Sequence, residues 1–174
     1  MTEARTAEER RLGERLAAFR ALPEADRTLP QNLLRYQPDR AAYDVCFGGR
    51  REAGQIAALF LRARRELTDP TDGDYMAALA DTLEQMDIQL YEHYRVLADL
   101  LLEAAQKSVG SRDPKIVNAL IKGVRLGLLD PERYLAPGLT AFRSLAGREP
   151  DQDGGGIWLI MAWSEYITAR EREI

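Results

Sequence analysis

The stretch from Tyr75 to Lys107, YMAALADTLEQMDIQLYEHYRVLADLLLEAAQK, decides the fold class of this 174-residue chain. It contains neither proline nor glycine, and its apolar positions recur at alternating steps of three and four residues. These positions are Met76, Leu79, Leu83, Met86, Leu90, His93, Leu97, Leu100 and Ala104. This period is typical of a long helix packed along one side against other helices. At 1.5 Å per residue the helix would be roughly 50 Å long, so residues 75–107 are predicted to form one central rod.

Shorter amphipathic patterns surround this rod and predict an all-α fold. Residues 50–67 and 114–128 repeat the helical period, and Asp113 with Pro114 marks a helix start. Three prolines between residues 23 and 38 predict a connector, and Pro137-Gly138 predicts a helix break. The whole chain, 1–174, is therefore expected to form a single-domain helical bundle of about six helices.

The C-terminal part combines a linker with an apolar helix. Residues 147–156 are polar and rich in glycine, which predicts a flexible loop, and both termini are expected to fray. The run from Ile157 to Trp163 is apolar on nearly every side. A helix of that kind is buried, either in the core of its own chain or against another molecule. Trp158 and Trp163 are therefore candidate binding residues.

Composition limits the classes of function. The formal net charge is −4, with 24 Lys and Arg against 28 Asp and Glu, so the chain as a whole does not attract nucleic acid or anionic membranes. A single cysteine excludes an internal disulfide framework, and one cysteine with one histidine cannot build a standard zinc site. The apolar runs are too short to span a bilayer. We expect a cytoplasmic protein without a cofactor.

Charge is distributed unevenly along the chain. Residues 48–68 contain five arginines and two glutamates, whereas residues 69–103 contain nine acidic residues and one arginine. This difference favours an antiparallel pairing of the helix at 50–67 with the rod. Six basic residues are candidates for phosphate contacts: Arg62, Arg64, Arg65, Lys115, Lys122 and Arg125. Their spacing spreads each set of three over more than one helix face, and pairing with the acidic rod accounts for the first set without a ligand.

Carboxylates on the rod suggest a different chemistry. Asp81, Glu84 and Asp87 lie three residues apart on one broad face, and Mg²⁺ prefers oxygen ligands of this kind. The Glu84-x-x-Asp87 spacing resembles that of the all-helical nucleotide pyrophosphohydrolases, which use magnesium. Those proteins carry a second carboxylate cluster on the preceding helix, and residues 50–67 lack its ExxE spacing. A solvated acidic face is the favoured interpretation.

His93, the single histidine of the chain, lies on the apolar side of the rod. It is a candidate general base or metal ligand. Its neighbour Glu92 points to another helix face and is no partner for it. A histidine that fills a core position and bonds a neighbour is the favoured interpretation.

These observations lead to three hypotheses about function. The leading one is a non-catalytic protein-interaction or assembly protein, which associates with a protein partner or with itself as a homo-oligomer. The second is a nucleic-acid-associated accessory subunit that uses the arginine-rich helices. The third is a Mg²⁺-dependent hydrolase with a carboxylate cluster on its central helix.

Overall fold

The computed structural model describes residues 2–67, 69, 71–146 and 155–171. The described residues contain eight α-helices and no strand, and 82% of them are helical, which confirms the all-α prediction. None of the described helices has both the length and the apolar character that crossing a membrane requires. The elements are α1 Thr2–Arg20, the 3₁₀ helix η1 Glu24–Thr28, α2 Pro30–Tyr43, the π-helical turn η2 Asp44–Gly48, α3 Ala53–Glu66, α4 Gly73–Gln85, α5 Tyr91–Ser108, α6 Pro114–Arg125, α7 Pro131–Ala146 and α8 Gly155–Glu171.

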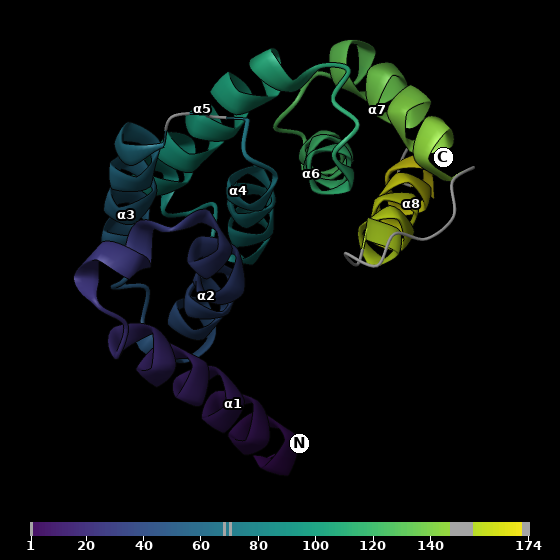
Figure 1. Cartoon of the computed structure of the whole chain (residues 1–174). Helices are drawn as coiled ribbons and strands as arrows, with labels where there is room; N and C mark the ends of the chain where they lie inside the picture. The colour runs from purple at the N-terminus through teal and green to yellow at the C-terminus, as the bar shows by residue number, and fades with distance from the viewer. Residues whose placement is uncertain (1, 68, 70, 147–154, 172–174) are drawn as a thin grey trace.

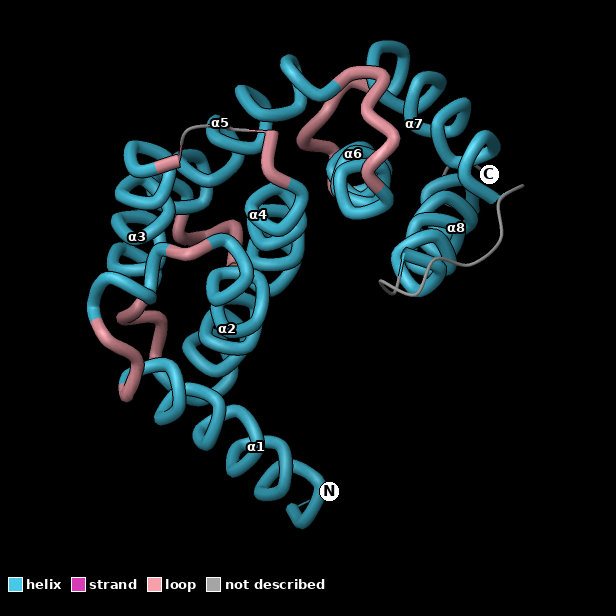
Figure 2. Tube along the Cα trace, in the orientation of Figure 1, coloured by secondary structure: helices cyan, strands magenta, loops and turns pink. Residues whose placement is uncertain are grey.

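The helices follow a curved path from α1 at one end to α7 and α8 at the other (Figure 1). Helix α4 lies in the middle of this path and packs against α2, α5 and α6. Helix α6 in turn carries α7 and α8. Most of the connections between helices are short loops (Figure 2). Because α4 and α6 lie side by side, they join the N-terminal and C-terminal parts of the molecule.

The predicted continuous rod at 75–107 is wrong. Helix α4 ends at Gln85 and α5 begins at Tyr91, so two helices replace the single one. Seven of the nine apolar positions in the pattern are nevertheless buried, while Leu90 and His93 are half-buried. The spacing of apolar residues therefore predicted correctly which positions are buried. It did not predict that the chain bends between the two helices.

The bend has a local physical cause. Met86 adopts an extended backbone conformation, and the Asp87 Oδ1 atom accepts a hydrogen bond from the backbone N–H of Gln89 at 2.8 Å. A short acidic side chain that bonds the backbone two residues ahead competes with helical hydrogen bonding. The other carboxylate oxygen of Asp87 pairs with Arg50 at 2.6 Å, and Arg50 also donates to the Gln89 side chain at 3.2 Å. The bend is thus tied to the segment that precedes α3.

That preceding segment reverses the chain between α2 and α3. The buried Asp44 carboxylate accepts hydrogen bonds from the backbone N–H groups of Arg51 and Glu52, at 2.8 and 2.9 Å. Gly49 and Arg50 both have positive φ values, 71° and 63°. Glycine adopts this conformation without steric cost, whereas a side chain makes it unfavourable. The reversal places Glu52 at the start of α3, close to α1 and α2.

Two predictions that were based on proline residues are wrong. Residues 30–43 form helix α2 rather than part of a connector, with Pro30 at its first position and Pro38 inside it. Helix α7 likewise continues through Pro137, where a break was expected. Tertiary packing of α2 against α4 outweighs the local preference. The expected helix start at Asp113 is confirmed, since its side chain caps α6 through a hydrogen bond, and Asp72 caps α4 in the same way.

The apolar core consists of two clusters that meet at α6. The larger one is built from α2 to α6, with Phe60, Tyr75 and Leu97 among its buried members. The smaller one joins α6, α7 and α8. Of the predicted loop at 147–156, residues 147–154 lie outside the described residues, and 155–156 begin α8. Residues 1 and 172–174 also lie outside them, while the described parts of both ends are helical.

Candidate functional site

Helix α8 lies on α6 and touches α7 along one edge. Its Ala162 is fully buried, and Leu159 and Tyr166 pack beside it against the smaller apolar cluster. The Trp163 ring stacks on Phe142 of α7 with 5.6 Å between the ring centroids. One side of α8 is therefore buried within the chain.

The opposite side of α8 is apolar and faces solvent. Four large apolar side chains on this side are exposed: Ile157 by 65%, Ile160 by 73%, Trp163 by 47% and Ile167 by 41%. They follow one another at intervals of three, three and four residues and are here called the α8 stripe. Residues at this spacing lie on one side of a helix. Packing within the chain thus covers one side of this apolar helix, and among the described residues only Phe142, which stacks on the Trp163 ring, covers part of the α8 stripe.

Beneath α8 lies a group of charged side chains contributed by α4, α6 and α8, here called the Lys122 cluster. It consists of Lys122, Arg125, Asp81, Glu84 and Glu165. The Lys122 Nζ atom is 2.7 Å from Asp81 Oδ1, 2.8 Å from Glu84 Oε2 and 3.3 Å from Glu165 Oε1. The Lys122 side chain is only 5% exposed. One ammonium group therefore holds carboxylates from two other helices.

Arg125 completes the cluster. Its guanidinium pairs with Glu84 and with Glu165, so the same two carboxylates bind both basic residues of α6. Three carboxylates against two cations leave the cluster with a formal charge of −1. Ion pairs this well enclosed are screened little by water.

The pKa directions follow from this arrangement. Burial raises the pKa of Asp81, and the neighbouring Glu84 and Glu165 charges add to the effect, although Lys122 opposes it. Burial alone would raise the pKa of Glu84, but hydrogen bonds and charges from Lys122 and Arg125 lower it. Burial alone would lower the pKa of Lys122, but the carboxylates around it, Asp81 first, raise it. Lys122 therefore stays protonated, and Asp81 takes up a proton more readily than Glu84 does.

The cluster brings together two sets of residues that the sequence analysis kept apart. Asp81 and Glu84 were candidate metal ligands, and Lys122 and Arg125 were candidate phosphate contacts. In the structure each set neutralises the other, and the Lys122 ammonium occupies the centre of the carboxylates. Within the described residues there is no group of three or more His, Cys, Asp or Glu side chains placed to hold a metal ion.

The other two candidate metal ligands lie away from this cluster. Asp87 pairs with Arg50 at the bend between α4 and α5. His93 lies on α5 against Gly54 of α3, where a Cβ atom on the glycine would come within 3.3 Å of the imidazole. The structure therefore separates Asp87 and His93 from Asp81 and Glu84.

Two of the three arginines of α3 are engaged in ion pairs. Arg62 pairs with Glu24 and Glu66, at 2.7 and 2.9 Å, and Arg64 pairs with Glu103 of α5 at 2.6 Å. The basic helix thus pairs with the second half of the predicted rod. Arg65 is exposed and donates to a backbone carbonyl on its own helix.

Lys115 lies two turns before Lys122 on α6. Its Nζ atom is 2.6 Å from Asp74 and 6.0 Å from the centre of the half-buried Trp158 ring. Helices α3 and α6 lie on either side of α4 (Figure 1), so the two basic sets form no common surface.

Sequence reasoning missed two features of this chain. Glu165 joins the Lys122 cluster from about 40 residues away, and no local period signals such a contact. A pocket of about 350 Å³ between α1, η1, α2 and α3 involves Arg27, a residue in the segment predicted to be a connector.

Comparisons with known proteins found no matching family model, no matching curated protein and no matching solved structure.

Proposed function

We propose that this chain is a non-catalytic helical interaction protein that self-associates through the α8 stripe. The observation that carries the proposal is the joint exposure of Ile157, Ile160, Trp163 and Ile167 on one side of one helix. Single exposed apolar residues are ordinary on protein surfaces, whereas a contiguous set is typical of an interaction site. The cytoplasm remains its proposed location.

The buried side of α8 supports the proposal because it fixes how the helix is rotated. Ala162 and Tyr166 pack on the apolar cluster, and Glu165 reaches Lys122 and Arg125 underneath. A helix held at this many points cannot roll to bury its outer side. The stripe is therefore presented rigidly, and Trp163, held by its stacking on Phe142, is a suitable aromatic anchor.

A second copy of the chain is the partner that the charges favour. No charged residue occurs from Gly156 to Ser164, and the next one, Glu165, is only 14% exposed at its side chain. Two chains of net charge −4 repel each other over most of their surfaces. The uncharged stripe is where that repulsion is weakest. A contact about a two-fold axis would bury the same apolar residues on both copies.

The two other hypotheses receive less support. Contacts with nucleic acid need cationic side chains that are available to phosphates, whereas Lys122 and Arg125 are enclosed by carboxylates and Arg64 is paired with Glu103. A magnesium site at Asp81 and Glu84 would compete with the Lys122 ammonium for the same oxygens. Neither hypothesis draws on the exposed surface of α8.

Substitution of Ile160 by glutamate tests the proposal. Ile160 is the most exposed residue of the stripe, so Ile160→Glu places a charge in the interface without touching the core. We expect the wild type to dimerise and Ile160→Glu to weaken dimerisation by at least about tenfold. Sedimentation equilibrium over a series of protein concentrations measures both.

The matched control is Ile88→Glu. Ile88 lies in the bend between α4 and α5 and is 66% exposed, close to the 73% of Ile160. This variant adds the same charge elsewhere and should dimerise as the wild type does. A wild type that stays monomeric up to about 100 µM, or equal losses in the two variants, would contradict the proposal. A monomeric wild type would leave a different protein as the occupant of the stripe.

A further inference from the structure

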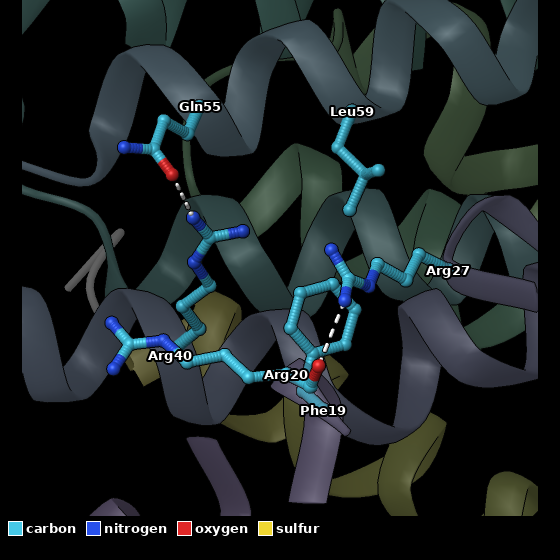
Figure 3. Close-up of a pocket in the computed structure, with 6 residues that line it drawn as sticks. All are labelled: Phe19, Arg20, Arg27, Arg40, Gln55 and Leu59. Carbon is cyan, nitrogen blue, oxygen red and sulfur yellow. Dashed lines mark hydrogen bonds between the residues drawn. The ribbon is translucent and has the colours of Figure 1, made fainter. Parts of the chain in front are cut away.

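A pocket of about 350 Å³ opens where α1, η1, α2 and α3 meet, far along the chain from the α8 stripe. Six residues line it, here called the arginine pocket: Phe19, Arg20, Arg27, Arg40, Gln55 and Leu59. Figure 3 shows Gln55 and Leu59 projecting from α3 above, and Arg27 and Arg40 entering from opposite sides. Its volume lies at the lower end of the range for small-molecule sites.

Two guanidinium groups flank the buried Phe19 ring. The Cζ atom of Arg40 is 5.5 Å from the ring centre, and that of Arg27 is 5.8 Å from it. Contacts of this kind hold arginine heads in fixed positions over an aromatic ring. Figure 3 shows the two heads on either side of the space above Phe19.

Internal hydrogen bonds hold the two heads further. Arg27 donates from Nε to the Leu22 carbonyl at 3.1 Å, and from Nη2 to the Arg20 carbonyl at 2.7 Å. Arg40 donates from Nε to Glu52 at 2.7 Å, and from Nη2 to the Gln55 Oε1 atom at 2.9 Å. The Nη1 atoms of both arginines make no hydrogen bond to any described residue. Each guanidinium group thus has an Nη1 donor that is available to a ligand.

Every acceptor near these donors is already used. The Gln55 Oε1 atom binds Arg40, which leaves the Nε2 donor as the free end of that side chain. One Glu52 oxygen accepts from Arg40 and the other from Arg20. What the pocket offers to a ligand is therefore a set of N–H donors from Arg27 and Arg40, with the Gln55 nitrogen turned away from the space between them.

The local charge has the sign opposite to that of the whole chain. Three arginines line the pocket and one carboxylate, Glu52, pairs with two of them, so the formal balance is +2. The chain as a whole carries −4. Several converging N–H donors with excess positive charge match the oxygens of a phosphate group, which arginine binds in a planar, paired geometry.

We propose that the arginine pocket binds the phosphate group of a small molecule through Arg27 and Arg40. The oxygens lie between the two guanidinium heads and accept from their Nη1 atoms, while Gln55 holds the Arg40 head in place. Leu59 gives the rest of a small ligand an apolar wall. The proposal rests on no feature of α8, so it is independent of self-association.

The probes are inorganic phosphate and glycerol 2-phosphate, titrated into the full chain by isothermal calorimetry at constant ionic strength with chloride. Saturable binding of either probe supports the proposal. Tighter binding of the ester indicates an organic phosphate as the ligand, and equal binding indicates that the phosphate group alone is recognised. Absence of saturable binding by both probes overturns the proposal.

The decisive variant is Gln55→Glu. Its carboxylate still accepts from Arg40, so the internal hydrogen bond survives, while a negative charge is added beside the pocket, which repels phosphate. Gln55 is exposed, and circular dichroism verifies the fold. We expect the dissociation constant for phosphate to rise by at least about tenfold. Gln55→Ala, which removes the acceptor that holds the Arg40 head but adds no charge, should give a smaller rise.

The matched control is Gln106→Glu, the same substitution at an exposed glutamine on α5 that does not line the pocket. It changes the net charge identically and should leave phosphate binding within about twofold of the wild type. Equal weakening in Gln55→Glu and Gln106→Glu would show a general charge effect and overturn the proposed site.

Discussion

The Lys122 cluster and the arginine pocket use the same kinds of side chain to opposite effect. In the cluster, three carboxylates enclose two cations, and the basic side chains are almost completely buried. In the pocket, one carboxylate serves two of three arginines, and N–H donors remain. The ratio of acidic to basic side chains thus distinguishes the Lys122 cluster, which joins helices, from the arginine pocket, which is the proposed binding site. Position in the sequence does not, because the basic residues of both regions lie on helical segments.

The strongest test of this comparison is Lys122→Met. The substitution keeps an unbranched side chain but leaves Asp81 without a cation and removes one partner from Glu84 and Glu165. Breaking a buried ion pair by removing one member costs about 3–5 kcal/mol. We expect a loss of that size in the free energy of unfolding, measured by urea denaturation.

Lys115→Met on the same helix is the control. Its ion pair with Asp74 is 33% and 26% exposed at the two side chains, so its loss should cost at most about 1 kcal/mol. Equal losses in the two variants would contradict the distinction between enclosed and solvated pairs. Adding Asp81→Asn to Lys122→Met should restore part of the stability, because it removes the carboxylate left without a cation.

Arg40→Met tests the pocket side of the comparison and should have an intermediate effect. Methionine can still cover Phe19, but the hydrogen bonds from Arg40 to Glu52 and Gln55 are lost. Glu52 keeps Arg20 as a cationic partner, which limits the loss of stability. Hydrogen bonds to charged groups are worth about 1.5–3 kcal/mol, so we expect about 2 kcal/mol in urea denaturation. A loss as large as that of Lys122→Met would mean that the pocket is a structural junction of the same kind.

The smallest effect concerns a solvated pair outside both regions. Arg64 and Lys107 hydrogen-bond to Glu103 and lower its pKa to about 2. Because this value lies below the ordinary 4.5, the stability contributed is present above about pH 4.5 and is lost as the pH falls toward 2. Glu103 is 40% exposed at its side chain, so Glu103→Gln should cost under about 1 kcal/mol at pH 7.

The measurement is the difference in unfolding free energy between wild type and Glu103→Gln at several pH values. The difference should shrink from pH 5 to pH 2. A difference that stays constant over this range would show that the pair does not contribute through the charge of Glu103.

Sequence patterns predicted burial better than they predicted chain path. The period through Leu83 and Leu97 identified core positions correctly, because burial follows from apolar spacing whether or not the helix is continuous. The break between those residues depends on Asp87, whose effect comes from a backbone hydrogen bond and from Arg50, which is distant in the sequence. Capping by Asp72 was predictable, because it involves residues only three positions apart.

The candidate sites were less accessible from the sequence. Asp81 and Lys122 were each identified, but their mutual neutralisation requires that α4 lie against α6, and no local pattern contains that information. The arginine pocket combines four elements, one of them in a segment where prolines suggested a connector. Exposure on one side of α8 became visible only once α6 and α7 covered the other side.

The contacts of Arg50 have one more consequence. The reversal before α3 and the bend after α4 are about 40 residues apart, yet they form a single corner because Arg50 bonds both Asp87 and Gln89. A residue with an unfavourable positive φ thereby gains two partners on the neighbouring turn, which offsets its strain. Two changes of chain direction that are far apart in the sequence are thus linked through the side chain of one residue.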